Sequence, residues 1–572
     1  MVTPLGIREI TKVLLLILPI SVYGEEELNP IVIQYDSHNS TLVHTPKVEL
    51  FEDRNVQIQA TTPGFKQPIV KGLQGDKILL KLDGIDFTNS LFRSGPNQYY
   101  SFIPDEFVTA ISIDDVLDNN SLGGTVNRQL GINESKFSID WDTVNSEQFD
   151  GNRSLVYTNG DLSLGAVFNN IYSVDNNPHS NYNQKAGYLE YKGFKFIHSR
   201  SDDIDRTDKF ENGQHYVYEE QYFTGAYKTF YLDNLDLNLS YNNFSELINK
   251  KGKYVETDND IFQANSIYYY NRLNLTLGSD HKLELIEYDN KGLTTDYEVF
   301  SNSFDVNYRN YWGDFDYSAF ALYDYTVISG SGYNNFDKHF DSFNMGARIE
   351  YKGIYASISE GFKYPTVPNL SEAISDSATE IPNQNLKQER SVKYVLGFNS
   401  EYINASIFST HLDDLIVRVP SDVLDEFGEY KFKVDNADSG YIHGSNINLK
   451  YTRDDFAFDV FAEYLYGETN LDYISKLTPL KIDTRVEYKN FYATHRWGMQ
   501  AQKLPKKDTS DIRIQDHNDG YSQLDIGYVY SPYPNHKFNI ELNNITNNKG
   551  RMLGSSVDYN DRNARLKYEF NY

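Results

Sequence analysis

The feature that most constrains this chain is an alternation of apolar and polar residues, which recurs from about residue 137 to the C-terminus. One clear run has apolar side chains at every second position, at Phe343, Met345, Ala347, Ile349 and Tyr351. A period of two predicts β-strands with one apolar and one polar face. The runs are about ten residues long, the length that a tilted strand needs to cross the hydrocarbon layer of a membrane.

The connections between these runs differ in character. Some are short, such as residues 351–354, whereas residues 201–208 and 250–260 read as long, polar and acidic loops. A soluble β-sandwich would also alternate, but short turns at one end and long loops at the other are typical of an outer-membrane barrel. About 440 residues at about 20 per strand and connection give on the order of 22 strands. We therefore predict an all-β transmembrane barrel of about 22 antiparallel strands over residues 131–572, ending on the aromatic Tyr572.

The N-terminal part of the chain reads differently. Arg8 and Lys12 precede an apolar run over residues 13–23, a pattern that predicts a secretory signal peptide over residues 1–24. Residues 25–130 have mixed periodicity and clustered glycines, which predicts a small α+β domain. Barrels of this size are plugged rather than open, so we expect residues 25–130 to form a plug in the lumen.

Composition excludes several functions. The 81 acidic against 53 basic residues give a net charge of -28, which argues against a nucleic-acid partner. The chain has no cysteine, and its histidines lack metal-ligand spacing, so neither a thiolate site nor a built transition-metal site is expected. No Gly-x-Ser-x-Gly nucleophile motif is present, and we expect no enzyme activity.

We expect no cofactor, although acidic loops could hold calcium, because close-set carboxylates suit that ion. A solvated acidic rim is the favoured alternative, since no complete calcium-loop pattern is present. The acidic residues in question are Asp202, Asp203, Asp205, Asp208, Glu256, Asp258 and Asp260.

An ordered series of motifs resembles the TonB-dependent outer-membrane receptors. Its members are residues 67–76, Leu82-Asp83-Gly84-Ile85 and 89–99 in the plug, and 359–365, 385–389, 412–416 and 436–444 in the barrel. The chain departs from the family pattern before Gly123-Gly124, and Lys71 stands where an arginine is usual. The resemblance covers nearly all of the mature chain.

The resemblance implies a function and a set of partners. These are active import of a scarce ligand across the bacterial outer membrane by a monomer, driven through TonB with ExbB and ExbD. The ligand would be a metal chelate or a vitamin: first a ferric siderophore, otherwise haem, cobalamin or another metal complex. The alternatives are a surface-binding barrel without transport, such as an adhesin, and an outer-membrane enzyme; a passive porin would need no plug.

Three groups of site residues follow from the resemblance. A TonB box, the segment that TonB would grip by strand pairing, is expected at Pro30, Ile31, Val32, Ile33, Gln34, Tyr35 and Asp36, although a plain first plug strand fits as well. Lys71 of the plug and Glu389 of the barrel would form a latch, or be solvated lumen charges. Ligand-facing positions are expected at Asp83, Phe92, Arg93, Tyr99 and Tyr100, where turn geometry is the alternative for Asp83-Gly84.

Overall fold

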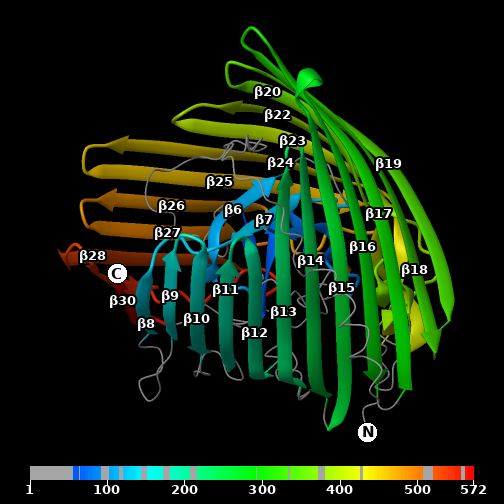
Figure 1. The fold of residues 1–572 in the computed structure, drawn as a ribbon, viewed down its shortest axis with the longest axis horizontal. Coiled ribbons are helices and arrows are strands. Elements are labelled where there is room, and N and C mark those ends of the chain that lie inside the picture. The colour runs from blue at the N-terminus through cyan, green and yellow to red at the C-terminus, as the bar shows by residue number, and fades with distance from the viewer. Residues whose placement is uncertain are drawn as a thin grey trace. The chain divides into compact units, whose positions relative to one another are not determined.

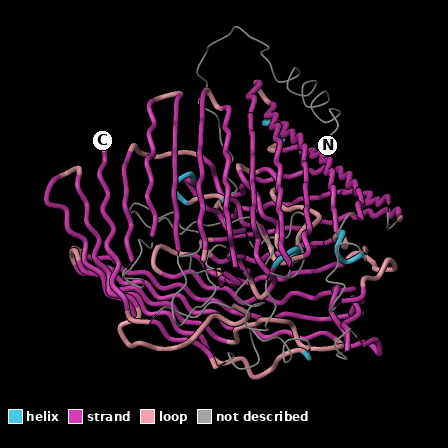
Figure 2. The backbone as a smooth tube through the Cα atoms, turned by 90° about the horizontal axis from the view of Figure 1, so that it is seen from below, coloured by secondary structure: helices cyan, strands magenta, loops and turns pink. Residues whose placement is uncertain are grey.

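The structure is a computed structural model, and all the residues that it describes lie within Ser40–Tyr572. The described residues are 56–62, 65–91, 102–114, 120–142, 151–171, 181–205, 216–250, 252–290, 293–332, 335–371, 380–424, 430–506, 519–555 and 561–572. No helix among them is long and apolar enough to cross a membrane. Figure 2 shows that strands dominate the described backbone, with loops between them and only a few short helical turns.

A closed barrel contains the strands from β8 to β30 (Figure 1). The two-residue β21 (Glu380–Ile381) pairs in parallel with β24, and β20 pairs directly with β22, so the antiparallel wall has 22 strands, as predicted. The wall strands are β8 (Lys136–Asp142), β9 (Gly151–Asn159), β10 (Leu162–Ile171), β11 (Tyr182–Tyr191), β12 (Phe194–Asp205), β13 (Tyr216–Leu232), β14 (Leu235–Lys250), β15 (Lys253–Tyr270), β16 (Leu275–Asn290), β17 (Leu293–Trp312), β18 (Phe315–Gly332), β19 (Phe336–Tyr351), β20 (Ile354–Lys363), β22 (Glu389–Asn399), β23 (Ile403–Leu424), β24 (Tyr430–Arg453), β25 (Phe456–Thr469), β26 (Leu480–Tyr488), β27 (Phe491–Met499), β28 (Gly520–Tyr533), β29 (His536–Asn543) and β30 (Asn563–Asn571).

The alternation in the sequence matches the two faces of this wall. On β19, Phe343, Met345 and Ile349 are about half exposed on the outside, whereas Ser342 and Asn344, on either side of Phe343, are buried toward the lumen. The apolar face is therefore the outer one, as a strand in lipid requires. Pairing around a closed ring also satisfies the backbone groups that lipid cannot hydrogen-bond.

The two ends of the barrel carry different connections. At one end, here the short-turn end, most connections are two residues long, for example residues 192–193 and 352–353. At the other end, the loop end, they range from residues 251–252 to the long connection 364–388, which contains the short helix α3 (Val367–Leu370). Because membrane barrels have short periplasmic turns, the loop end is expected to be extracellular.

Two of the expected long acidic loops are largely strand. β12 continues to Asp205, and residues 250–260 lie almost wholly in β14 and β15, so Glu256, Asp258 and Asp260 are strand residues. Polarity suggested loops, but a strand that extends beyond the hydrocarbon meets water on its outer face and can carry charges there. No group of carboxylates or histidines that could hold a metal ion occurs among the described residues, and Asp208 lies outside them.

The plug consists of two small sheets. The first is β1–β2–β3, and the second has the order β5–β4–β7–β6. Helical structure in the described plug residues is limited to two 3-10 turns, so the expected α+β character is mostly β. The elements are β1 (Gln57–Thr62), β2 (Phe65–Val70), β3 (Leu73–Gln74), η2 (Gly75–Lys77), β4 (Leu79–Leu82), β5 (Ile85–Asp86), η4 (Asp105–Phe107), β6 (Val108–Asp114) and β7 (Thr125–Leu130).

Candidate functional site

The first plug sheet reaches the barrel wall through a tight turn. Lys71 and Gly72 join β2 to β3 with φ of 49° and 81°, the positive values of a two-residue hairpin turn. The turn projects the Lys71 ammonium to 3.2 Å from Glu463 Oε1 of β25. Lys481 of β26 lies 3.3 Å from the other oxygen of this carboxylate, so one buried glutamate holds two lysines.

A second plug lysine makes the contact expected of Lys71. Lys77, on η2, pairs with Glu389 at the start of β22. The Glu389 side chain is fully buried, and its Oε1 also accepts the backbone N–H of Ile416 at 2.7 Å. The predicted Lys71–Glu389 pair is therefore wrong, although both residues lie at the contact between plug and barrel. The turn aims Lys71 at β25, and the 3-10 helix that follows presents Lys77 to β22.

At the second plug sheet the charges are reversed, because the plug supplies the carboxylate and the wall supplies the lysine. Asp83 and Gly84 form the turn between β4 and β5, with φ of 54° and 78°, and Asp83 Oδ2 lies 2.8 Å from Lys195 Nζ of β12. The other oxygen accepts the N–H of Leu130 at 2.7 Å. Burial raises the pKa of the Asp83 carboxyl, and attraction to Lys195 opposes that rise. Asp83 was expected to face ligand, but it is a turn residue bound to the wall.

Next along the chain, Asp86 Oδ2 lies 3.1 Å from Lys282 Nζ of β16. Ser90 then donates its N–H and its hydroxyl to the buried Glu284 carboxylate, the hydroxyl at 2.8 Å. Its carbonyl accepts the N–H of Val367 at 2.9 Å, so Ser90 also contacts the connection 364–388. The plug segment that leads to the expected ligand-facing loop is therefore bound to the wall on one side and to a loop on the other.

Apolar contacts accompany these polar ones. Phe87 is fully buried, with its ring centroid 5.3 Å from Phe223 and 5.2 Å from Phe244, both on the wall. Both contacts are edge-on, an arrangement that adds about 0.5–1.5 kcal/mol to the burial itself. Arg128 of β7 pairs with Asp105 inside the plug.

The remaining predicted site residues belong to two other segments of the chain. Phe92, Arg93, Tyr99 and Tyr100 lie outside the described residues, as does the expected TonB box, Pro30 to Asp36. The wall residues that sequence reasoning missed are Lys195, Lys282, Glu284, Glu463 and Lys481. For Glu463 a signal existed, because it is an acidic residue at an inward position of an otherwise alternating strand.

Comparison with known proteins identifies the architecture. The family model described as "TonB dependent receptor-like, beta-barrel" matches residues 83–547. The chain belongs to the TonB-dependent receptor family. No curated protein matches its sequence.

Solved structures share the receptor's fold at low sequence identity. The copper transporter OprC superposes with a TM-score of 0.72 at 11% identity, over 91% of this chain and 94% of that chain. The FrpB iron transporter from Neisseria meningitidis gives 0.68 at 10% identity, over 91% and 96%. The siderophore receptor PirA from Acinetobacter baumannii gives 0.64 at 13% identity, over 91% and 94%. The receptor is thus an outer-membrane barrel whose plug contacts the wall through paired charges of both signs.

Proposed function

We propose that this receptor actively imports a scarce metal complex, with a ferric siderophore as the first candidate and haem, cobalamin or another chelate as alternatives. The proposal is supported by structural similarity to transporters named for copper, iron and siderophores. At 10–13% identity this similarity concerns the fold alone. The proposed cargo class is therefore the one that the names of these proteins share, a metal or a metal complex.

The observation that carries the active part of the proposal is the set of buried ion pairs between plug and wall. Glu389 and Glu463 are at most 4% exposed, and each is paired with a plug lysine. Separating a buried pair leaves a charge without its partner, at a cost of about 3–5 kcal/mol. A cargo of ordinary affinity would have to break several such contacts to pass, so an external energy source is expected.

The energy source in this proposal is TonB, with ExbB and ExbD, acting on residues 30–36. Strand pairing depends on backbone N–H groups, and proline removes one of them and fixes φ. Ile33→Pro should therefore abolish uptake while leaving cargo binding at the cell surface intact. Ile33→Val is the matched control, because it keeps the N–H and the β-branched shape.

The test proceeds in two steps. Expression of the receptor is first measured under separate depletion of iron, copper and cobalamin, and strong induction by one of them names the cargo class. Accumulation of that labelled cargo is then compared in cells with wild-type receptor, Ile33→Pro and Ile33→Val, with and without a protonophore. Uptake that persists in the proline variant and in de-energised cells would contradict active transport and favour a surface-binding barrel.

A further inference from the structure

The pairing between β19 and β20 stops part-way along the wall. The two strands pair from Tyr351↔Ile354 to Gly346↔Ser359 and no further. β19 nevertheless continues beside β18 up to Phe336, and β20 continues beside β22 up to Lys363. The two strands therefore separate toward the loop end, and no strand among the described residues covers this edge of β19.

The cause lies in the last residues of β20. Gly361, Phe362 and Lys363 are all buried, so the alternation of inward and outward side chains ends and the strand turns into the lumen. Tyr364 follows, and its ring lies 5.3 Å from Phe340 and 5.0 Å from Phe362. Tyr364 therefore packs against Phe340 of β19, although the backbone of β20 no longer pairs with that strand.

The free edge can be assigned residue by residue. Met345 donates its N–H to the Glu360 side chain at 3.1 Å, so its backbone groups point toward β20. Successive residues of a strand point their backbone groups to opposite sides, so Phe343, Asp341, His339 and Asp337 point the same way as Met345. On the side of β19 that faces β20, the described residues pair with no strand between Phe336 and Met345. The one contact there is the hydrogen bond from Met345 to the Glu360 carboxylate.

An unpaired edge of this kind is a template for another strand. Barrels normally remove such edges by closure, and soluble proteins cover or shorten them. Here the edge runs over the half of β19 nearest the loop end, where the outer side chains Asp337, His339 and Asp341 are exposed. It is therefore open to water rather than to lipid.

The outer surface on the β18 side of this edge strand is acidic. Asp337 is in register with Ser329 of β18, which is in register with Glu298 of β17. One row further out, Asp258, Glu287 and Asp296 are also in register with one another.

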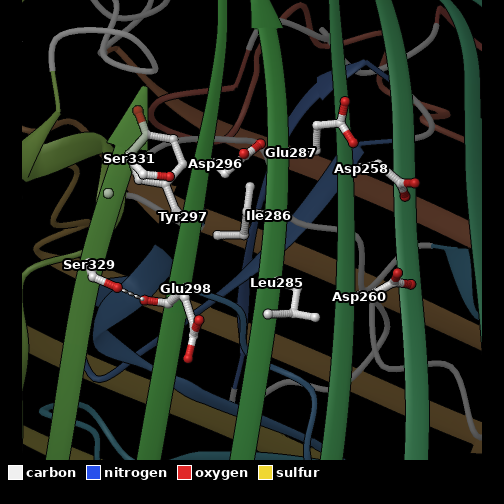
Figure 3. Close-up of a pocket in the computed structure, with 11 residues that line it drawn as sticks. Asp258, Asp260, Leu285, Ile286, Glu287, Asp296, Tyr297, Glu298, Ser329 and Ser331 are labelled. Atoms are coloured by element: carbon white, nitrogen blue, oxygen red, sulfur yellow. Dashed lines mark hydrogen bonds between the residues drawn. The ribbon is translucent and has the colours of Figure 1, made fainter. Parts of the chain in front are cut away.

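Four of these carboxylates, together with Asp260 and Ser329, line a cavity of about 550 Å³ on β15–β18 (Figure 3). A segment that approaches the edge thus meets a negative field, and a positively charged segment is attracted.

We propose that the free edge of β19 is a docking site for an extended, basic segment of a partner protein at the cell surface, added to the wall as a further strand. Main-chain hydrogen bonds to Asp337, His339 and Asp341 supply affinity, as in β-strand addition. Basic side chains at alternate positions of the incoming strand would lie across from the Asp337 and Asp341 carboxylates, where opposite charges are favourable. The site is independent of the cargo and of the TonB box.

The test uses full-length receptor in lipid nanodiscs and a labelled nine-residue peptide that alternates lysine and threonine. The receptor variant is His339→Pro, which removes an N–H that has no partner among the described residues, and proline is tolerated at such edge positions. The matched control is His339→Ala, which removes the same side chain and keeps the N–H. We expect the proline variant to bind the peptide about tenfold more weakly than wild type, and the alanine variant to bind within about twofold.

Two further arms separate backbone pairing from charge. A peptide that is N-methylated at alternate amides should bind wild-type receptor about tenfold more weakly than the parent peptide. This arm uses wild-type receptor alone, so it holds even if the proline variant folds poorly. The double variant Asp337→Asn with Asp341→Asn should bind more weakly and depend less on salt.

Several outcomes would overturn the proposal. They are absence of binding by the parent peptide, equal binding of the methylated and parent peptides, or unchanged affinity in a well-folded proline variant. A receptor dimer that the proline variant abolishes would show that the occupant is a second copy instead.

Discussion

Two turns of the plug have almost the same backbone and opposite chemistry. Lys71-Gly72 and Asp83-Gly84 both have positive φ at both residues. The first directs a cation to Glu463 of the wall, and the second directs an anion to Lys195. The same kind of turn thus anchors the two plug sheets to different parts of the wall through charges of opposite sign.

This difference has a consequence for stability. At the first plug sheet and the 3-10 helix that follows it, here the first side, the wall supplies the carboxylates of Glu389 and Glu463, which are at most 4% exposed. At the second plug sheet, here the second side, the paired groups are slightly more exposed, with Asp83 at 13% and Lys195 at 18%. Because water screens charges, the Lys77–Glu389 contact should be more costly to break than the Asp83–Lys195 contact.

The largest effect is expected from Glu389→Ala, which leaves Lys77 buried without its carboxylate and Ile416 without its acceptor. The plug should become easier to open locally by about 3–5 kcal/mol, measured by hydrogen exchange of plug amides. The matched control is Lys387→Ala, because Lys387 forms an exposed pair with Asp414 and such pairs contribute at most about 1 kcal/mol. Equal protection in both variants would contradict a structural role for the buried pair.

For the second plug sheet, Asp83→Ala should lower the free energy of local opening by a smaller amount. The change breaks the pair with Lys195 and the hydrogen bond from Leu130. We expect about 2–3 kcal/mol, seen as faster exchange in β4 and β7 rather than in β1–β3. Swapping the pair, Asp83→Lys with Lys195→Asp, should restore part of the protection. If exchange rises equally in both sheets, the two sides do not act separately.

Lys71→Ala should lower the free energy of local plug opening by less again, although the Lys71–Glu463 pair resembles the Lys77–Glu389 pair. Glu463 keeps Lys481 as a partner at 3.3 Å, so its charge is not left alone. We expect about 1–2 kcal/mol, and ion leakage through reconstituted receptor should rise less than in Lys77→Ala. A leak larger than that of Lys77→Ala would reverse the order of the two contacts.

The smallest effects are expected at the glycines of the turns. Gly84→Ala meets no atom within 4 Å, so only the left-handed backbone is strained, by about 1 kcal/mol. In Gly72→Ala the added carbon would also lie 3.1 Å from Leu477, so this variant should be the less stable of the two. Thermal inactivation of cargo binding provides the comparison, and equal values would show that Leu477 moves aside freely.

The sequence by itself determined the barrel, its number of strands and its lipid face. These properties are local, because a period of two places alternate side chains on opposite faces wherever the strand lies. The glycine turns Lys71-Gly72 and Asp83-Gly84 are also local, since each needs only two residues with positive φ. Even where strands continue beyond the expected length, as in β15, the alternation of faces is kept.

Only the tertiary structure decided which charges meet. Lys77 and Glu389 are 312 residues apart in the chain, and Lys71 and Glu463 are 392 apart. Their meeting depends on the stagger of the strands around the ring and on the depth of the plug in the lumen, and no short-range pattern encodes either. The unpaired edge of β19 has the same origin, because it arises where β20 separates from β19 and where Phe362 and Tyr364 pack in one buried cluster.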